Sequence, residues 1–254
     1  MNIYEAVFAR KSVRSYWMET ISDSLLESIK NYHREVQGLF GKIETEVSIV
    51  DNHRGQQKIL GLFGVQAPFY LLIYSEDGEK AAMNAGYVMQ QTALHIYSKG
   101  MGSCFVNPAW VKKSFQQKNG KKLYAVVAFG RSKNNYTRKP AEAKRLSISK
   151  LCVYKENPRL WMKQLLEAAR MAPSSLNSQP WRFVVYDNRI HVFSKGKSTG
   201  QMKQLDELNF GIMFANMMVV AEELWLDVDL IRLEEITQKN FPNSQYVLST
   251  ILRV

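Results

Sequence analysis

Basic residues flank a hydroxyl near the start of the chain, in the run Arg10-Lys11-Ser12-Val13-Arg14. Alternate side chains of an extended segment project to the same side, so Arg10, Ser12 and Arg14 would present two guanidinium groups and a hydroxyl together. Such groups bind phosphate or another anion through charge-assisted hydrogen bonds. The spacing alone leaves a second interpretation open, which is a basic turn exposed to solvent.

A second polar segment, PSSLNSQPW, runs from Pro173 to Trp181. It follows a stretch rich in Ala and Leu, and its prolines would end that helix and stiffen the loop. The hydroxyl and amide side chains between the prolines offer donors and acceptors to a polar, planar ligand. A loop that only terminates a helix is the alternative, although the segment holds more polar residues than a turn requires.

A third segment joins a helix-like stretch to a strand-like one, in the run Gly100-Met101-Gly102 followed by Ser103–Val106. Glycine lets backbone N–H groups approach a ligand closely, and it is also a common helix cap, so both interpretations stay open. The run lacks the GxGxxG order and the preceding strand of a dinucleotide-binding turn. We therefore exclude a Rossmann-type site here.

The rest of the chain carries little chemistry of its own. The histidines and the two cysteines, Cys104 and Cys152, show no metal-ligand spacing, and no GxSxG or GxxxxGK[ST] motif occurs. We predict no catalytic side chain and no metal site. If the protein is an enzyme, a bound cofactor is expected to supply the chemistry.

The helices that must position these segments recur along the chain. LLESIK at 25–30 returns as LLEAAR at 165–170. A longer run at 84–101, NAGYVMQQTALHIYSKGM, matches NFGIMFANMMVVAEELWL at 209–226, with Asn and Gly in the same places. Both longer runs are apolar nearly all round at helical spacing, which predicts two buried helices.

Short apolar runs of strand length accompany the helices in the same order. EVSIVDN at 46–52 returns as RFVVYDN at 182–188, and LYAVVAFG at 123–130 has a weaker counterpart in YVLSTILRV at 246–254. Further strands are expected at FYLLIYS and IHVFS. Each part of the chain therefore predicts a helix, a strand, a buried helix and a strand.

Neither part looks self-sufficient, because a helix that is apolar on most faces needs a packing surface beyond its own small sheet. We predict an α+β fold of two tandem halves, residues 1–145 and 146–254, that pack as a pseudo-dimer with sheets flanked by helices. The join lies in the basic, Pro-containing run RSKNNYTRKPAEAKR. A monomer with this internal pseudo-dimer is expected rather than an obligate homodimer.

The formal net charge is +11, and its excess lies between Lys112 and Arg145, where Glu142 is the only acid. No nucleic-acid-binding motif accompanies this stretch and aromatic interleaving is thin, so no nucleic-acid partner is expected. The chain lacks the h-region of a signal peptide and a run long enough to span a bilayer. We expect a cytoplasmic protein with no membrane partner.

Taken together, the motifs resemble those of the nitroreductase-like FMN flavoproteins, and the tandem arrangement resembles the group labelled "putative TM nitroreductases". The resemblance rests on RKSVRSY, MAPSSLNSQPWRFVVY, the NAGYVMQQTAL helix running into GMGSCFV, and the AVVAFGR strand. It covers most of the chain. It implies an α+β fold in which FMN binds at an interface between subunits or, here, between the two halves.

The resemblance also implies which residues hold FMN. The first half would contribute Arg10, Lys11, Ser12, Arg14, Ser103, Cys104, Phe105, Val106, Arg138 and Lys139. The second half would contribute Pro173, Ser174, Ser175 and Asn177. Arg10 and Ser12 would lie near the phosphate, with Arg138 or Lys139 closing on it. Arg14 would lie beside N1 and O2 of the flavin, and Ser103–Val106 would run past its N5 edge.

A symmetric pair of halves would have two flavin sites, but one of them has lost its motifs. HREVQGLFGK stands where the first half should carry the Pro-Ser-Ser-x-Asn loop. LCVYKEN stands where the second half should carry Arg-x-Ser-x-Arg, and EELWLDVDL replaces GMGSCFV. Both losses fall on the same pseudo-site, so we predict one FMN per chain.

The activity implied by the resemblance is an FMN-dependent oxidoreductase. Hydride would pass from NADH or NADPH to the flavin and then to a small electron-poor acceptor such as a nitroaromatic or a quinone. A cation at Arg14 would favour negative charge on the reduced ring. The alternative is a flavin-binding protein without NAD(P)H turnover, or one that supplies reduced flavin to a partner.

Overall fold

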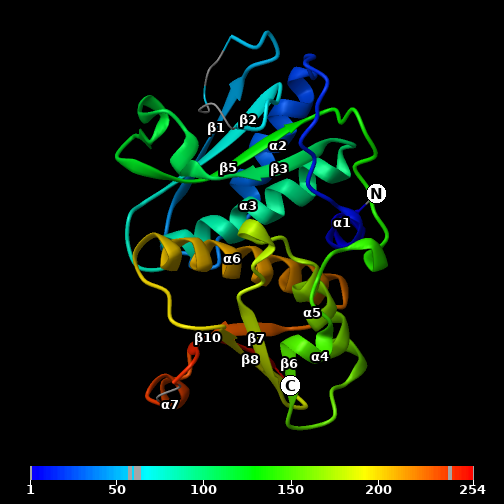
Figure 1. Cartoon of the computed structure of the whole chain (residues 1–254), viewed down its shortest axis with the longest axis vertical. Coiled ribbons are helices and arrows are strands. Elements are labelled where there is room, and N and C mark those ends of the chain that lie inside the picture. The colour runs from blue at the N-terminus through cyan, green and yellow to red at the C-terminus, as the bar shows by residue number, and fades with distance from the viewer. Residues whose placement is uncertain (1, 57–58, 60–63, 240–241, 254) are drawn as a thin grey trace.

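The computed structural model describes residues 2–56, 59, 64–239 and 242–253 of the 254-residue chain. Two β-sheets lie at opposite ends of the molecule, and two long helices, α3 (Ala81–Ser98) and α6 (Gly200–Glu223), lie between them (Figure 1). The fold is therefore a layered α+β arrangement. Within the described part of the chain, no helix has the length and apolar character needed to cross a membrane.

The first sheet is antiparallel, and one of its two inner strands, β2, is buried on both faces. Its strands, in spatial order, are β1 (Thr45–Asp51), β2 (Phe69–Ser75), β5 (Lys121–Gly130) and β3 (Gly102–Val106), with β4 (Gln117–Lys118) also paired to β5. In β2, Phe69 and Leu71 pack into the main core, whereas Tyr70 and Leu72 face a second cluster on the other side. This alternation explains why FYLLIYS has no polar face.

The second sheet repeats the four-strand path β1-β2-β5-β3 and carries its fifth strand, β6 (Cys152–Tyr154), at one edge. Its strands, in spatial order, are β6, β7 (Trp181–Val185), β8 (Arg189–Ser194), β10 (Gln245–Leu252) and β9 (Val228–Ile231). The path β7-β8-β10-β9 is antiparallel, as is β1-β2-β5-β3. The sequence counterparts EVSIVDN and RFVVYDN form β1 and β7, which hold the same place in the two sheets.

The central helices approach each other at two glycines. A Cβ atom on Gly86 of α3 would fall on the carbonyl oxygen of Leu208. A Cβ atom on Gly211 of α6 would fall on the carbonyl oxygen of Met83, and its distance to the Tyr87 nitrogen would be 2.7 Å. The contact is reciprocal, as contacts across a twofold axis are. Only glycine allows the two backbones to lie this close.

The remaining helices cover the edges of these layers. They are α1 (Ile3–Ala9), α2 (Asp23–Glu35), α4 (Ile148–Leu151), α5 (Leu160–Met171) and α7 (Glu234–Thr237), with 3-10 turns at Pro108–Trp110, Lys113–Phe115, Pro140–Glu142 and Ser175–Asn177. A capping box starts α1, because Asn2 and Glu5 each accept a hydrogen bond from the other's backbone N–H. This cap fixes the helix that leads into Arg10.

The expected helices and strands are present, but one segment lies elsewhere than its sequence counterpart. The Arg10–Arg14 run lies beside β3, where Ser12 forms a parallel bridge to Ser103. LCVYKEN, its counterpart, forms β6 and pairs with β7 at the opposite edge of its own sheet. The division of the chain at residue 145 stays a prediction, and "first half" and "second half" denote residues 1–145 and 146–254 below.

Candidate functional site

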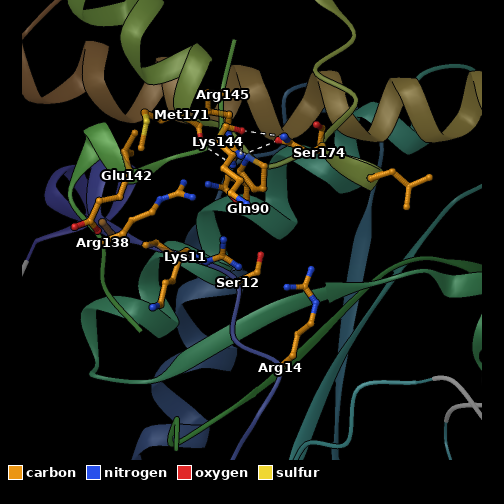
Figure 2. Close-up of a pocket in the computed structure, with 16 residues that line it drawn as sticks. Lys11, Ser12, Arg14, Gln90, Arg138, Glu142, Lys144, Arg145, Met171 and Ser174 are labelled. Carbon is orange, nitrogen blue, oxygen red and sulfur yellow. Dashed lines mark hydrogen bonds between the residues drawn. The ribbon is translucent and has the colours of Figure 1, made fainter. Parts of the chain in front are cut away.

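A cavity of about 580 Å³ opens between α1, α3, the end of α5 and the segment that joins the two halves. We call residues 131–146 the joining segment. Its volume lies within the range of small-molecule sites, roughly 300–1,000 Å³. The residues that line it are Ala6, Val7, Arg10, Lys11, Ser12, Arg14, Gln90, Arg138, Glu142, Lys144, Arg145, Met171, Pro173, Ser174, Leu176 and Asn177 (Figure 2). Both halves therefore contribute to one cavity.

The lining is strongly cationic. Six of its side chains are basic, and Glu142 is the only acidic one. Among the described residues, none of these six cations forms an ion pair with an acid. Unpaired cations in a concave surface attract an anion, because low-dielectric walls strengthen their field. The cavity is suited to a ligand with at least one strongly anionic group.

Arg10 is held rigidly at the end of α1. It is only 5% exposed, its Nε donates to Ser103 Oγ at 3.1 Å and its Nη2 donates to the Ser103 carbonyl at 3.3 Å. The guanidinium carbon also lies 4.8 Å from the ring centroid of Phe105. Burial lowers the pKa of Arg10 to about 10. A bound anion would relieve this cost of burying a cation.

The strand β3 supports this arginine from behind and does not line the cavity. Ser103, Cys104 and Val106 are buried in the sheet, and the Val13 backbone N–H donates to the Ser103 carbonyl at 3.0 Å. Burial raises the pKa of the Cys104 thiol. Gly102 is needed for chain packing, since an added Cβ would lie 2.7 Å from Cγ2 of Val13. A flavin contact from Ser103–Val106 stays a prediction.

Two arginines from the joining segment, Arg138 and Arg145, complete the cationic wall. Burial lowers the pKa of both, to about 10 for Arg145, and positive neighbours that include Arg170 lower it further. The Nε atoms of Arg138 and Arg145 are buried and have no hydrogen-bond partner among the described residues. Buried donors without partners are costly, so these atoms point to a ligand with acceptor oxygens.

The Pro-Ser-Ser-x-Asn loop has strained backbone. Leu176, Asn177 and Gln179 have φ angles of 51°, 56° and 46°, although none of them is glycine. Such conformations persist only where surrounding contacts impose them, and they are common at ligand sites. Leu176 is fully exposed at the cavity and offers an apolar surface.

The joining segment holds the loop in place through hydrogen bonds that we call the latch. Arg145 Nη1 donates to Asn177 Oδ1 at 2.8 Å, and Asn177 Nδ2 donates to the Lys144 carbonyl at 2.9 Å. The Leu146 backbone N–H donates to Gln179 Oε1 at 2.7 Å. The amide of Asn177, predicted to bind FMN, is thus engaged on both sides by the joining segment. Arg145 closes the latch and also lines the cavity.

Besides Ser103–Val106, two further predicted residues lie outside the cavity lining. Ser175 donates through its backbone N–H and its hydroxyl to Asn209 Oδ1 on α6, at 2.9 and 3.2 Å. Lys139 is exposed, and its backbone N–H donates to Glu142 Oε2 at 3.0 Å. Ser175 therefore anchors the loop to α6, and Lys139 starts the turn that carries Glu142.

The other lysines of the basic stretch are used differently. Lys118 and Lys121 pair with Glu46 and Glu44 at 2.6 and 3.2 Å, and Lys122 pairs with Asp77. Lys118 lies on β4, and Lys121 and Lys122 lie on β5, so all three belong to the first sheet. These three charges are therefore neutralised on the sheet, whereas Arg138, Lys144 and Arg145 line the cavity with no ion pair among the described residues.

The structure thus brings together residues predicted from both ends of the chain. Eight of the predicted residues line the cavity: Arg10, Lys11, Ser12, Arg14, Arg138, Pro173, Ser174 and Asn177. Sequence reasoning missed Gln90, Lys144, Arg145 and the apolar patch of Ala6, Val7 and Met171. A signal existed for Gln90, because a buried amide in a mostly apolar helix must find a polar partner.

Comparison with known proteins adds to this geometry. Residues 2–221 match the family described as "Putative TM nitroreductase". The chain belongs to this family. A curated relative from Staphylococcus epidermidis, described as a "Putative NAD(P)H nitroreductase", is 42% identical over 59 residues. That match spans 22% of this chain and only 27% of the relative's length.

One solved structure matches this chain along nearly its whole length. A protein from Thermotoga maritima, described as "a putative nitroreductase", matches with a TM-score of 0.64 at 19% identity, covering 99% of this chain and 94% of that one. A nitroreductase with bound FMN from Desulfitobacterium hafniense gives a TM-score of 0.45 at 16% identity, covering 58% of this chain and 100% of that one. The first likeness shows that this chain has the nitroreductase fold along its whole length.

Proposed function

We propose that the protein is an FMN-dependent oxidoreductase that passes hydride from NAD(P)H to a small electron-poor acceptor, with one FMN bound between the two halves. The observation that carries this proposal is the single cavity in which the Arg10–Arg14 run meets the loop that follows α5. The site is cationic, partly buried and free of ion pairs among the described residues. These properties favour a phosphorylated ligand.

The residues present fit the phosphate end of FMN. A phosphate monoester carries close to two negative charges at neutral pH and has three strong acceptor oxygens. It would give acceptors to the buried Nε atoms of Arg138 and Arg145, which lack a described partner. Ala6, Val7 and Met171 add apolar but nearly fully buried side chains to the same lining, and the exposed side chain of Leu176 offers an apolar surface to an aromatic ring.

The cofactor, when bound, supplies the hydride chemistry, so the protein groups bind, orient and stabilise charge. Arg10, Arg138 and Arg145 would hold the phosphate. In the view of Figure 2, Arg14 lies apart from Arg138 and Arg145. This separation leaves Arg14 to stabilise negative charge that develops on the ring, as the resemblance implies.

The same charges are suited to a nicotinamide donor. Lys144 is exposed at the cavity and Lys11 is half-buried there, so both are accessible to a second anionic molecule. The Staphylococcus epidermidis relative is named for NAD(P)H, which is consistent with this class of donor. We propose that donor and acceptor use the same opening in turn.

One cofactor per chain follows from the placement of the motifs. The phosphate-binding run and the polar loop each occur once, and both line one cavity. A single chain can therefore build the whole site, and we propose that it functions as a monomer with no nucleic-acid partner.

The absorption spectrum of the purified protein tests the cofactor assignment. We expect a flavin spectrum, release of FMN on denaturation, and saturation at one FMN per polypeptide during reconstitution. A colourless protein that cannot be reconstituted would overturn the assignment. Saturation at two FMN per polypeptide would overturn the single-site proposal.

Turnover separates an oxidoreductase from a flavin carrier. We expect steady oxidation of NADH or NADPH by the FMN-loaded protein in the presence of menadione or a nitrofuran. Loaded protein that shows no oxidation with either nicotinamide would contradict the proposed hydride transfer and favour flavin binding alone.

A further inference from the structure

We propose that Gln90 is a cofactor-contacting residue whose side-chain oxygen accepts a hydrogen bond from an N–H or O–H group of the bound flavin. The proposal rests on the proposed function, because it assumes that FMN occupies the cavity. It concerns the part of the cavity lining that α3 contributes, which belongs to neither the Arg10–Arg14 run nor the polar loop.

The orientation of the Gln90 amide is set by its neighbours. Asn216 on α6 donates through Nδ2 to the carbonyl of Ala168 at 3.0 Å. The Asn216 oxygen is therefore left as an acceptor, and it accepts from Gln90 Nε2 at 2.6 Å. Since this bond uses the nitrogen of the Gln90 amide, Oε1 is the free end. Two residues of the second half, Asn216 and Ala168, thus determine which atom Gln90 of the first half presents.

This free end lacks a partner that its burial requires. Gln90 is 2% exposed, and its Oε1 has no hydrogen-bond partner among the described residues. An unsatisfied buried acceptor costs roughly the desolvation of that group, which makes it rare in native structures. Gln90 also lines the cavity, and Figure 2 shows it between the Lys144–Arg145 pair and Ser12. A ligand in the cavity is the partner best placed to satisfy the oxygen.

The chemistry of the cavity narrows what that partner is. The six cations of the lining present donors, which suit phosphate and carbonyl oxygens of a ligand. Gln90 Oε1 is instead an acceptor, so it recognises a donor on the ligand. FMN carries such donors in two places, the ring N3–H and the ribityl hydroxyls. Gln90 would therefore fix the position of the flavin relative to its phosphate.

The experiment compares FMN binding by wild type and Gln90→Leu, using quenching of flavin fluorescence. We expect Gln90→Leu to weaken FMN binding roughly 10-fold, the value of one hydrogen bond to a buried acceptor. Each protein is also titrated with N3-methyl-FMN and with FMN analogues that lack single ribityl hydroxyls. The loss should vanish for the analogue from which the relevant donor is missing, and this identifies the donor.

Matched variants separate binding from folding. Gln91→Leu makes the same change one residue along α3, outside the cavity lining, and is expected to bind FMN as wild type does. Gln90→Leu combined with Asn216→Leu removes the unpaired Asn216 oxygen, and it should show the same loss of FMN affinity as the single variant.

Either of two outcomes would overturn the proposal: equal FMN affinity in wild type and Gln90→Leu, or an equal loss with every analogue. If wild type itself fails to bind FMN, the proposed function falls and this inference falls with it. If wild type binds FMN and Gln90 proves irrelevant, only this inference falls.

Discussion

The edge strands β3 and β9 hold the same place in the two sheets, yet the chain beside them differs. The outer edge of β3 receives the Arg10–Arg14 run through the bridge between Ser12 and Ser103. In the part of the chain that the structure describes, no strand or bridge pairs with the outer edge of β9. The corresponding run forms β6 at the far edge of the second sheet. The common framework thus carries the Arg10–Arg14 run at the edge of β3.

The difference between the two edges distinguishes the shared sheets and central helices, which position loops, from the segments beside the edge strands, which supply the cationic side chains. The sheets and the α3–α6 crossing position two loops, one after α2 and one after α5, and each is held by an asparagine of a central helix. Asn84 accepts from the Phe40 N–H at 3.0 Å, and Asn209 accepts from the Ser175 N–H at 2.9 Å. Only the second loop lines the cavity described above. The site therefore depends on additions to the framework.

The largest expected effect comes from breaking the shared framework. Gly86→Ala and Gly211→Ala should each destabilise the protein by roughly 3 kcal/mol or more, because the added methyl group meets the backbone of the facing helix. Urea unfolding measures the change. Gly78→Ala is the control, since an added Cβ there has nothing within 4 Å. If only one of the two variants is destabilised, the two halves do not share the crossing equally.

The next largest effect tests the edge that carries the arginines. Arg10→Ala should weaken FMN binding by about 100-fold or more, since it removes a buried cation and leaves Ser103 without its partner. Lys150 lies 15 residues before LLEAAR, as Arg10 lies 15 residues before LLESIK, and it is exposed. Lys150→Ala should leave FMN affinity unchanged. Comparable losses in both variants, measured by fluorescence titration, would contradict the one-sided site.

A smaller effect distinguishes the two asparagine anchors. Asn209→Ala and Asn84→Ala should each cost about 1–3 kcal/mol of stability, because each removes the acceptor of a loop N–H group. Only Asn209→Ala should also lower FMN affinity, by roughly 10-fold, since it releases the loop that lines the cavity. A fall in affinity in Asn84→Ala would show that the first loop also serves the cofactor.

The smallest expected effect sharpens the role of charge at the cationic edge. Raising the ionic strength from about 0.05 M to about 0.5 M should weaken FMN binding by roughly threefold, because added salt screens partly exposed cations such as Lys11 and Lys144. Riboflavin, which lacks the phosphate, should show no such dependence. Equal salt dependence of the two ligands would mean that the cations do not contact the phosphate.

Much of the framework could be predicted because apolar periodicity reports burial directly. The runs at 84–101 and 209–226 correspond to α3 and α6, although α6 begins earlier, at Gly200. Its first turn is exposed and its second is partly exposed, and both are mostly polar, so they lack the apolar signal of a buried helix. The edge taken by β6 could not be predicted, because alternation along a strand does not say which neighbour it pairs with.

The site could be predicted where its residues are adjacent in sequence. The Arg10–Arg14 run and the Pro173–Asn177 loop each bring several polar groups to one place. The role of Arg145 could not be predicted from the sequence, since it depends on how the joining segment approaches the Pro173–Asn177 loop in space. Gln90 lies within an apolar run, and its role depends on Asn216, which is 126 residues away.

The latch has a consequence for how such a chain can be inherited. The predicted division of the chain lies at residue 145, and there Lys144 and Arg145 of the first half bond to Asn177 of the second. Recombination at this junction would pair a joining segment from one ancestor with a loop from another. The halves can therefore be exchanged only if the two sides of the latch change together, and the unit of inheritance is the whole chain.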